Sequence, residues 1–211
     1  MRSRMSKRRV GLVMMIIGVL AVAAGLGLGG YNLWDNYRAG IEATAVMNDI
    51  AQRQEETKLS ALDEEQEASP DTNREISALE IDGKRYIGTI LIPAVDIELP
   101  VQEGWSLSLL RTAPCRYKGS VYQRDLIICA HNYVTHFGRL KNLLTGDKVI
   151  FTDINGNEFR YTVVDLEILA GTAIEEMESG AWELTLFTCT LGGQMRVTVR
   201  CELLEAESAS L

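Results

Sequence analysis

Near its end the chain carries Leu184-Thr185-Leu186-Phe187-Thr188-Cys189-Thr190, then Leu191-Gly192-Gly193-Gln194, then Met195-Arg196-Val197-Thr198-Val199-Arg200. The two outer runs predict β-strands, and the glycine pair predicts a two-residue turn because glycine adopts the positive φ angles that such turns need. In that register Leu191 pairs with Gln194, and Cys189 lies opposite Arg196 with Cβ atoms roughly 4.5–5.5 Å apart. A guanidinium beside a thiol favours the thiolate, which is the reactive form of cysteine.

The same register gives this hairpin one packed face and one chemical face. Side chains of a strand alternate between its two faces. The face opposite Cys189 is apolar and is expected to join the core; it carries Leu184, Leu186, Val197, Val199 and Cys201. Cys201 then pairs with Leu184 and points away from Cys189, which argues against a disulfide between these two cysteines.

The chain has four cysteines, so disulfides have to be considered for any part that lies outside the cell. A bridge between Cys115 and Cys129 remains open. The interpretation we favour treats Cys115, Cys129 and Cys201 as small buried hydrophobic residues. Cys189 is then the cysteine with a chemical role.

The N-terminal region predicts a membrane anchor. Basic residues crowd positions 2–9, and an uncharged run follows at residues 10–30. About 20 apolar residues span a bilayer core as a helix. The basic residues before the run, and Asp35 after it, place the N-terminus in the cytoplasm and the rest of the chain outside the cell. A cleaved signal peptide is the alternative, with Ala21-Val22-Ala23 as its cleavage site, but the run is long for that purpose. We therefore expect an uncleaved single-pass anchor in the lipid bilayer of the cell membrane.

The segment after the anchor predicts a stalk. Ile41, Ala45, Val46 and Ile50 recur at helical spacing. The later run Asp63-Glu64-Glu65-Gln66-Glu67 is acidic and lacks bulky apolar residues, so we expect it to be disordered. A spacer is preferred over an acidic interaction tail. The net charge of −8 argues against nucleic acid as a partner.

From Ile81 the pattern changes to short apolar runs separated by turn signals. Strands are expected at residues 86–93, 97–101, 125–130, 148–152, 158–164, 182–190 and 195–203, and short helices at 107–111, 137–144 and 174–178. Such a series predicts an all-β domain, either a barrel or a sandwich. The chain divides into a basic cytoplasmic tail (1–9), a transmembrane signal anchor (10–31), an acidic extracellular stalk, partly helical or disordered (32–79), the β domain (80–205) and a C-terminal tail (206–211).

A cysteine nucleophile usually needs a partner that accepts and returns a proton, and the chain has two histidines, His131 and His136. His131 directly follows the apolar strand that ends at Ala130, a position well suited to face a cleft. His136 lies in the next loop and is expected to be a loop or hydrogen-bonding residue. Cys129, His131 and His136 could instead be metal ligands, but no paired Cys-x-x-Cys spacing supports zinc, and we expect no metal and no cofactor. A purely structural His131 is a further alternative.

These residues together resemble those of the sortases, membrane-anchored transpeptidases on the surface of Gram-positive bacteria. Thr185-Leu186-Phe187-Thr188-Cys189 fits the Thr-Leu-x-Thr-Cys signature of that family, and Arg196 occupies the place of its essential arginine. Ile128-Cys129-Ala130-His131-Asn132 is similar to the segment that carries the catalytic histidine, although many members have glycine where Ala130 stands. The matching segments run in the same order over residues 80–205.

The resemblance implies a closed eight-stranded β-barrel with the site at one end and catalytic roles for His131, Cys189 and Arg196. Cys189 would attack a Leu-Pro-x-Thr-Gly-like sorting signal of a surface protein and form a thioester. His131 would protonate the departing amine and deprotonate the incoming one, and Arg196 would stabilise the oxyanion or hold the substrate backbone. The acceptor would be an amine of a cell-wall precursor or a pilin lysine. Residues 171–181 are expected to form one wall of an apolar substrate groove.

Within the family, the sequence favours a class D-like enzyme. Only about thirty residues separate Phe159 from Cys189, which leaves little room for the long helix of class B members. The short Gly192-Gly193 connection departs from class A, and the second hydrophobic span that pilin-polymerising members often carry is not evident. A pilin-polymerising sortase, a surface cysteine protease that hydrolyses the same type of bond, and a non-catalytic binding module with this fold are the alternative functions.

Overall fold

The structure is a computed structural model that describes residues 7–63, 75–179 and 182–204. The chain forms two units, Met1–Arg38 and Ala39–Leu211, which are described separately. The two terminal tails expected at residues 1–9 and 206–211 fall largely outside the described residues. The same holds for the acidic part of the expected stalk at residues 64–74.

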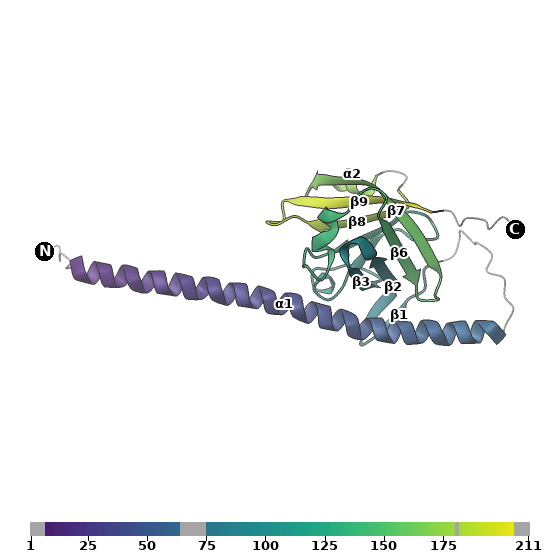
Figure 1. The fold of residues 1–211 in the computed structure, drawn as a ribbon, viewed down its shortest axis with the longest axis horizontal. Coiled ribbons are helices and arrows are strands. Elements are labelled where there is room, and N and C mark those ends of the chain that lie inside the picture. Colours follow the sequence, from purple (N-terminus) through teal and green to yellow (C-terminus); the bar gives the residue numbers. More distant parts are fainter. Residues whose placement is uncertain (1–6, 64–74, 180–181, 205–211) are drawn as a thin grey trace. The chain divides into compact units, whose positions relative to one another are not determined.

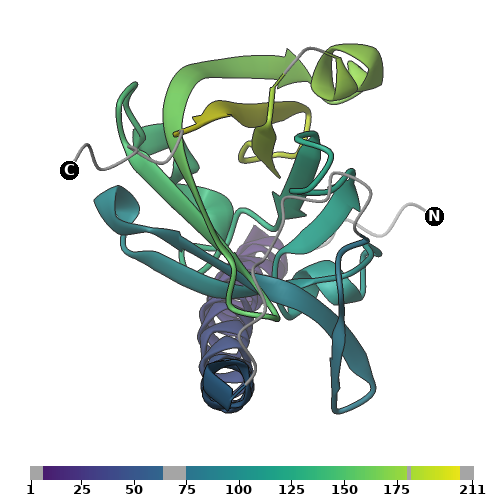
Figure 2. The ribbon, with the colours of Figure 1, turned by 90° about the vertical axis from the view of Figure 1, so that its right-hand side faces the viewer.

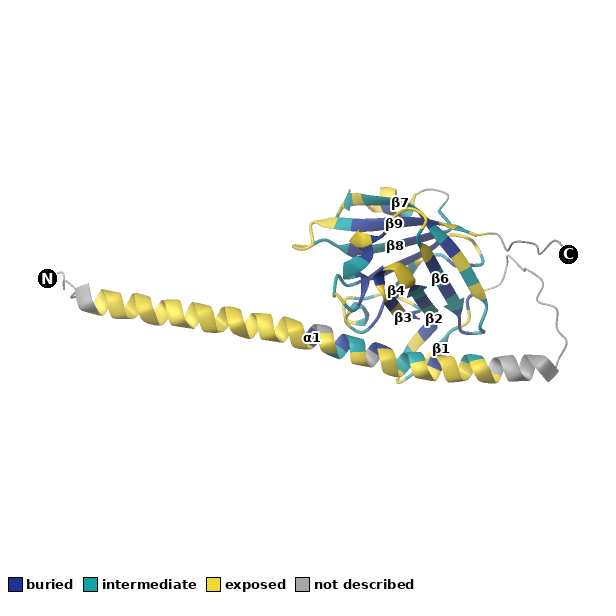
Figure 3. Cartoon of the chain, in the orientation of Figure 1, coloured by how far each residue is buried: buried dark blue, intermediate teal, exposed yellow. Residues whose placement is uncertain are grey.

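The first unit is the beginning of a long helix, α1 (Lys7–Asp63). From Arg9 to Trp34 every residue is exposed, as the yellow part of α1 shows in Figure 3. One described helix, Arg9–Glu56, is long and apolar enough to cross a membrane, and the expected anchor at residues 10–31 lies within it. An apolar helix without protein around it is what a lipid environment requires.

Within the second unit, the later part of α1 packs against the β domain. A stripe at spacings of four, three and four residues faces inward: Ala39, Ala43 and Ile50 are buried, and Val46 is half-buried. Ile50 contacts a small cluster with Tyr86, Ala113 and Ile154. The sequence predicted a stripe of Ile41, Ala45, Val46 and Ile50. Its first two residues, Ile41 and Ala45, are exposed and do not belong to the packed face.

The β domain is a closed barrel. Its strands are β1 (Leu79–Ile81), β2 (Lys84–Ile92), β3 (Ile97–Gln102), β4 (Cys115–Lys118), β5 (Leu126–Ala130), β6 (Lys148–Asp153), β7 (Glu158–Ala170), β8 (Leu184–Cys189) and β9 (Met195–Leu203). The sheet order from β2 is β2-β3-β4-β5-β8-β9-β7-β6, and pairing of β6 with β2 closes the circle (Figures 1 and 2). The expected eight-stranded barrel is therefore confirmed, with β1 added as a short hairpin partner of β2.

Two seams of the barrel are parallel, and they differ in length. β5 and β8 pair over five residues on each strand, from Leu126 with Leu184 to Ala130 with Thr188. β3 and β4 pair only at Gln102 and Cys115 and diverge beyond that point. The β5–β8 seam brings the chain segments of His131 and Cys189 next to each other. The β3–β4 seam leaves an opening in the wall of the barrel.

The core confirms the packed face of the β8–β9 hairpin. Leu184, Leu186, Val197, Val199 and Cys201 are all buried in the main hydrophobic cluster. These residues come from alternate positions of the two strands, as side-chain alternation requires. The other face of the hairpin is thereby turned away from the core.

Several elements differ from the sequence-based expectation. β4 was expected as a loop, and β7 continues to Ala170 instead of ending at Val164, because residues 165–170 pair with β9. The short helices are η1 (Pro93–Val95), η2 (Leu109–Arg111), η3 (Phe137–Asn142) and α2 (Ile174–Glu178). α2 has the expected bounds, whereas the helices expected at 107–111 and 137–144 are shorter 3-10 turns.

Candidate active site

The β8–β9 hairpin places Cys189 directly opposite Arg196, as its sequence predicts. The strands end earlier than expected, so Leu191 and Gln194 belong to the loop instead of forming the last pair. Thr190 closes this loop: its N–H donates to Met195 O (2.9 Å), and its carbonyl accepts from Gly193 N (2.9 Å). The register of Cys189 is unchanged because the longer loop takes one residue from each strand.

The parallel seam between β5 and β8 brings His131 to the other side of Cys189. Ala130 pairs with Thr188, and His131 and Cys189 are the next residues of the two chain segments. Paired strands lie about 4.8 Å apart. The Thr188 hydroxyl donates to Ala130 O (2.8 Å), and Asn132 Nδ2 donates to Thr190 O (3.5 Å). β8 lies between β5 and β9, so Cys189 lies between the residue that follows β5, His131, and Arg196 on β9. We call these three residues the row.

All three residues of this row line one cavity of about 340 Å³. The rest of its lining is mostly apolar and comprises Trp105, Leu107, Leu110, Tyr117, Cys129, Ala130, Ala170, Gly171, Ala173, Ile174, Met177, Phe187 and Thr188. Residues 171–177 thus form part of the wall, as expected for residues 171–181, of which 180 and 181 lie outside the described residues. An apolar lining limits the access of water to groups in the cavity.

Arg196 is held by the hairpin loop. Its Nη1 donates to Gly193 O (2.8 Å) and to Met195 O (3.1 Å). Within the part of the chain that the structure describes, Nε and Nη2 of Arg196 donate no hydrogen bond. A guanidinium carries five N–H donors in a rigid plane, so the loop orients the group while donors remain for a ligand.

The two histidines have different surroundings. The His131 ring stacks on Tyr133, with centroids 4.8 Å apart and planes 24° apart, and Tyr133 is in turn 5.3 Å from the ring of His136. His136 is fully buried and does not line the cavity. Among the described residues, no group of three or more His, Cys, Asp or Glu side chains could hold a metal ion.

The wall formed by α2 is anchored to the barrel by a buried arginine. Arg200 on β9 is 2% exposed. Its guanidinium donates to the carbonyl oxygens of Met177 (2.9 Å) and Glu176 (2.6 Å) and to the Glu167 carboxylate (2.8 Å). Because Met177 lines the cavity, Arg200 sets the position of that wall from beneath.

A second anchor ties α2 to β4. Glu178 accepts hydrogen bonds from Lys118 Nζ (2.6 Å) and from the Tyr117 hydroxyl (3.1 Å). The Lys118 ammonium lowers the pKa of Glu178, and Glu178 raises the pKa of Lys118. Burial, followed by the hydrogen bond to Glu178, raises the pKa of Tyr117. The ion pair is therefore present throughout the neutral pH range.

The other three cysteines are free thiols in the core. Burial raises the pKa of Cys115 and of Cys201 to about 12, and burial raises the pKa of Cys129 still further. Cys115 and Cys129 are cross-strand partners on β4 and β5, and the disulfide that the sequence left open is not formed between them in the structure. Cys189 is half-buried and is therefore more accessible than the other three thiols.

Three aromatic residues of the cavity were not identified from the sequence. Phe187 could have been, because it lies two residues before Cys189 on the same strand and so shares its face. Tyr117 belongs to the strand that was expected as a loop. Trp105 lies in the loop after β3, where no periodic pattern indicates the direction of its side chain. Its ring is 5.5 Å from that of Tyr117, which contacts Phe187 edge-to-face at 5.3 Å.

Comparison with known proteins gives one consistent match. The family model described as "Sortase domain" matches residues 90–204. The chain is similar to "Sortase A" of Bacillus anthracis, with 28% identity over 192 residues that cover 88% of this chain and 89% of the relative. It is also similar to "Sortase D" of Bacillus subtilis (strain 168), with 27% identity over 183 residues that cover 82% and 88% of the two chains.

Solved structures show the same fold. A sortase D5 transpeptidase of Clostridium perfringens has a TM-score of 0.54 at 18% identity, covering 78% of this chain and 96% of that chain. The sortase A of Listeria monocytogenes has a TM-score of 0.51 at 22% identity, covering 57% and 88%. At these identities the likeness concerns the barrel alone.

Proposed function

Because this chain belongs to the sortase family, whose members are cysteine transpeptidases of the cell wall, we propose that it cleaves a Leu-Pro-x-Thr-Gly-like sorting signal and transfers the surface protein to a cell-wall amine. In this proposal Cys189 is the nucleophile, His131 is the acid and base, and Arg196 binds the oxyanion or the substrate backbone. The supporting observation is that these three residues, the first directly after β5 and the others on β8 and β9, line one cavity.

In the first half-reaction, the Cys189 thiolate attacks the carbonyl carbon of the threonine in the signal. A carbon–sulfur bond forms, the peptide C–N bond breaks, and His131 gives a proton to the departing amine. Arg196 uses Nη1 to bind the carbonyl oxygens of Gly193 and Met195. Its remaining N–H donors are available to the negative oxygen that develops on the attacked carbonyl.

In the second half-reaction, the amine of the acceptor attacks the thioester. The new C–N bond forms, the C–S bond breaks to regenerate the Cys189 thiolate, and the amine proton passes to His131. The apolar lining from Leu107, Ile174 and Met177 favours the amine over water as the attacking group, since it keeps ordered water away from the thioester.

The cellular arrangement is part of the same proposal. Sortases are membrane-associated, and α1 contains a candidate span. We place the N-terminus in the cytoplasm, the anchor at residues 10–31, the stalk at 32–79 and the catalytic barrel at 80–205 outside the cell. The relatives include both a sortase A and a sortase D at nearly equal identity, so the class D-like assignment receives only weak support from them.

The test uses the full-length protein in detergent micelles with a fluorogenic sorting peptide. Cys189→Ala and His131→Ala should each abolish cleavage, and mass spectrometry of the wild type should detect the acyl thioester. Cys129→Ala is a matched control, because it removes a thiol of the same cavity that lies outside the row. Adding triglycine should divert the product from the acid to the amide, as transfer requires and simple hydrolysis does not. Full activity of Cys189→Ala would end the proposal.

A further inference from the structure

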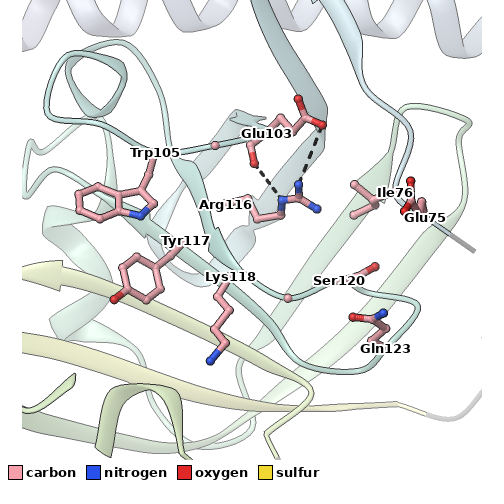
Figure 4. Close-up of a pocket in the computed structure, with 11 residues that line it drawn as sticks. Glu75, Ile76, Glu103, Trp105, Arg116, Tyr117, Lys118, Ser120 and Gln123 are labelled. Carbon is pink, nitrogen blue, oxygen red and sulfur yellow. Dashed lines mark hydrogen bonds and ion pairs between the residues drawn. The ribbon is translucent and has the colours of Figure 1, made fainter. Parts of the chain in front are cut away.

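The seam between β3 and β4 opens into a second cavity. After the single pair Gln102–Cys115, the chain leaves β3 through residues 103–105 while β4 continues through residues 116–118. The space between these segments is a cavity of about 560 Å³ (Figure 4). The rest of its lining consists of Glu75, Ile76, Gly119, Ser120 and Gln123. Unlike the cavity of Cys189, it is lined mainly by polar side chains.

The second cavity adjoins the candidate active site. Trp105 and Tyr117 line both cavities, and their rings lie 5.5 Å apart. Tyr117 is 5.3 Å from Phe187, which lies on the same face of β8 as Cys189 and two residues before it. Two residues of a strand span about 7 Å, so the shared aromatic wall lies roughly 12 Å from Cys189 along this path. An extended peptide of about four residues covers that distance, and Arg116, the neighbour of Tyr117 on β4, lies about one residue further.

The wall of the second cavity includes an open strand edge. Beyond Cys115, β4 pairs with β5 on one side, and within the described residues no strand pairs with its other side. Unpaired N–H and C=O groups along a strand edge bind an extended peptide as an additional strand. This edge therefore suits a peptide in preference to a compact small molecule.

The lining of the second cavity carries two carboxylates, Glu75 and Glu103, and two cations, Arg116 and Lys118, so what matters is which cation has donors left for a ligand. Arg116 Nε donates to the backbone oxygen of Glu103 (2.8 Å), which orients the guanidinium, as Figure 4 shows. Its Nη2 is 4.0 Å from the Glu103 carboxylate, which lies closer to Arg85 at 3.0 Å. Lys118, by contrast, is engaged by Glu178 at 2.6 Å. Arg116 is thus the positioned cation with donors available for the planar, two-point contact that a carboxylate makes.

We propose that the second cavity binds the acceptor of the transfer reaction, a peptide amine that carries a carboxylate about four to five residues from the reacting nitrogen. The peptide lies along the edge of β4 with its carboxylate on Arg116, and its amine extends past Trp105 and Tyr117 to the thioester on Cys189. This inference rests on the proposed function and adds the chemical class of the acceptor. The cavity contributes binding and orientation, while the bonds change at Cys189 and the amine proton passes to His131.

The test compares acceptors that differ only in the carboxylate. Full-length protein in detergent micelles receives a sorting peptide together with tetraglycine or tetraglycinamide, and the transfer product is quantified by mass spectrometry. We expect a KM about tenfold lower for tetraglycine than for its amide, the effect of one charge-assisted hydrogen-bonded pair. Diglycine and diglycinamide, at about 7 Å, are too short to reach Arg116 and should have equal KM values.

Two variants address the cavity, and a third is the matched control. Arg116→Gln should remove the difference between tetraglycine and its amide. Gly104 lines the second cavity but not the first, and a Cβ at this position meets nothing within 4 Å, so Gly104→Leu should fill the space and raise the KM of both tetrapeptides. Arg160→Gln removes an exposed cation outside both cavities and should keep the wild-type preference.

The outcomes separate this inference from the proposed function. Equal KM values for tetraglycine and its amide in the wild type would overturn the inference, and so would a preference that survives in Arg116→Gln. If Arg116→Gln does not fold, an unchanged KM in Gly104→Leu overturns it instead. Cleavage without acceptor is measured in the same samples. A wild type that leaves the sorting peptide intact would contradict the proposed function itself.

Discussion

At the scale of single residues, the position of Cys189 is set by two kinds of strand pairing. An antiparallel partner places Arg196 opposite it, and a parallel neighbour places His131 at its other side. Neighbouring strands of a sheet lie about 5 Å apart, so both residues come from chain segments next to Cys189. A carbonyl carbon bonded to the sulfur would therefore have a proton donor on one side and a cation on the other.

Arg196 is the residue of the row whose role depends most on its shape. Arg196→Lys should lower kcat/KM for a sorting peptide by about 100-fold, because a lysine ammonium does not reproduce the planar set of donors. Steady-state cleavage of a fluorogenic peptide measures this loss. Arg160→Lys, an exposed arginine outside the cavity, is the control and should have no effect. Near-wild-type activity of Arg196→Lys would leave Arg196 only a structural role in the hairpin loop.

At the scale of elements, α2 is a short helix that owes its position to its contacts. It has five residues, too few to be stable alone, and Arg200 and the Lys118–Glu178 pair attach it to β9 and β4. Since α2 supplies Ile174 and Met177 to the cavity, these attachments determine the shape of the substrate wall. In the acid range, the attachment to β4 weakens when the Glu178 carboxylate becomes protonated.

Glu178→Gln tests the attachment to β4. The pKa of Glu178 is lowered from 4.5 in the folded protein, so its charge stabilises the fold above the unfolded-state value, and this contribution disappears as the pH falls through the folded-state value. The melting temperature of Glu178→Gln should be below that of the wild type at pH 7, and the difference should shrink as the pH falls below the unfolded-state pKa and on through the lowered folded-state pKa. Thermal unfolding between pH 3 and pH 8 measures the gap. A gap that widens towards acid pH would contradict the assignment.

The later part of α1 offers a matched pair of isoleucines. Ile50 is 1% exposed and Ile41 is 54% exposed. In a fragment that starts at residue 39, Ile50→Ala should lower the free energy of unfolding by about 2–4 kcal/mol, since it leaves a cavity against Tyr86 and Ile154. Ile41→Ala should change it by less than about 0.5 kcal/mol. Denaturant unfolding measures both values, and equal losses would show that this helix does not pack on the barrel.

At the scale of the whole molecule, the sequence predicted what depends on local alternation and turns. The register of Cys189 and Arg196 follows from residues 184–200 alone, and the position of His131 follows from the apolar strand before it. β4 was missed because its strand character comes from pairing with β5, which lies outside its own short sequence. The second cavity was missed for the same reason, since it exists only where β3 and β4 separate.

The four thiols of the molecule should react very differently. Cys115, Cys129 and Cys201 are at most 3% exposed, and burial raises their pKa values, so they remain protonated at neutral pH. Iodoacetamide at about pH 7.5 should therefore label one thiol of the native chain, and Cys189→Ala should leave none labelled. Intact-mass measurement counts the labels, with the denatured protein as the reference for all four cysteines. Two labels on the native chain would contradict the burial of the other three.

The long parallel seam between β5 and β8 also determines when, during folding, the cavity around Cys189 is assembled. Ala130 and Thr188, which join the two strands, are 58 positions apart in the chain. Contacts between distant parts of a chain form slowly, after the local ones. A partly folded chain therefore has Cys189 and His131 far apart. The cavity that these two residues share with Arg196 is complete only once the β5–β8 seam has formed.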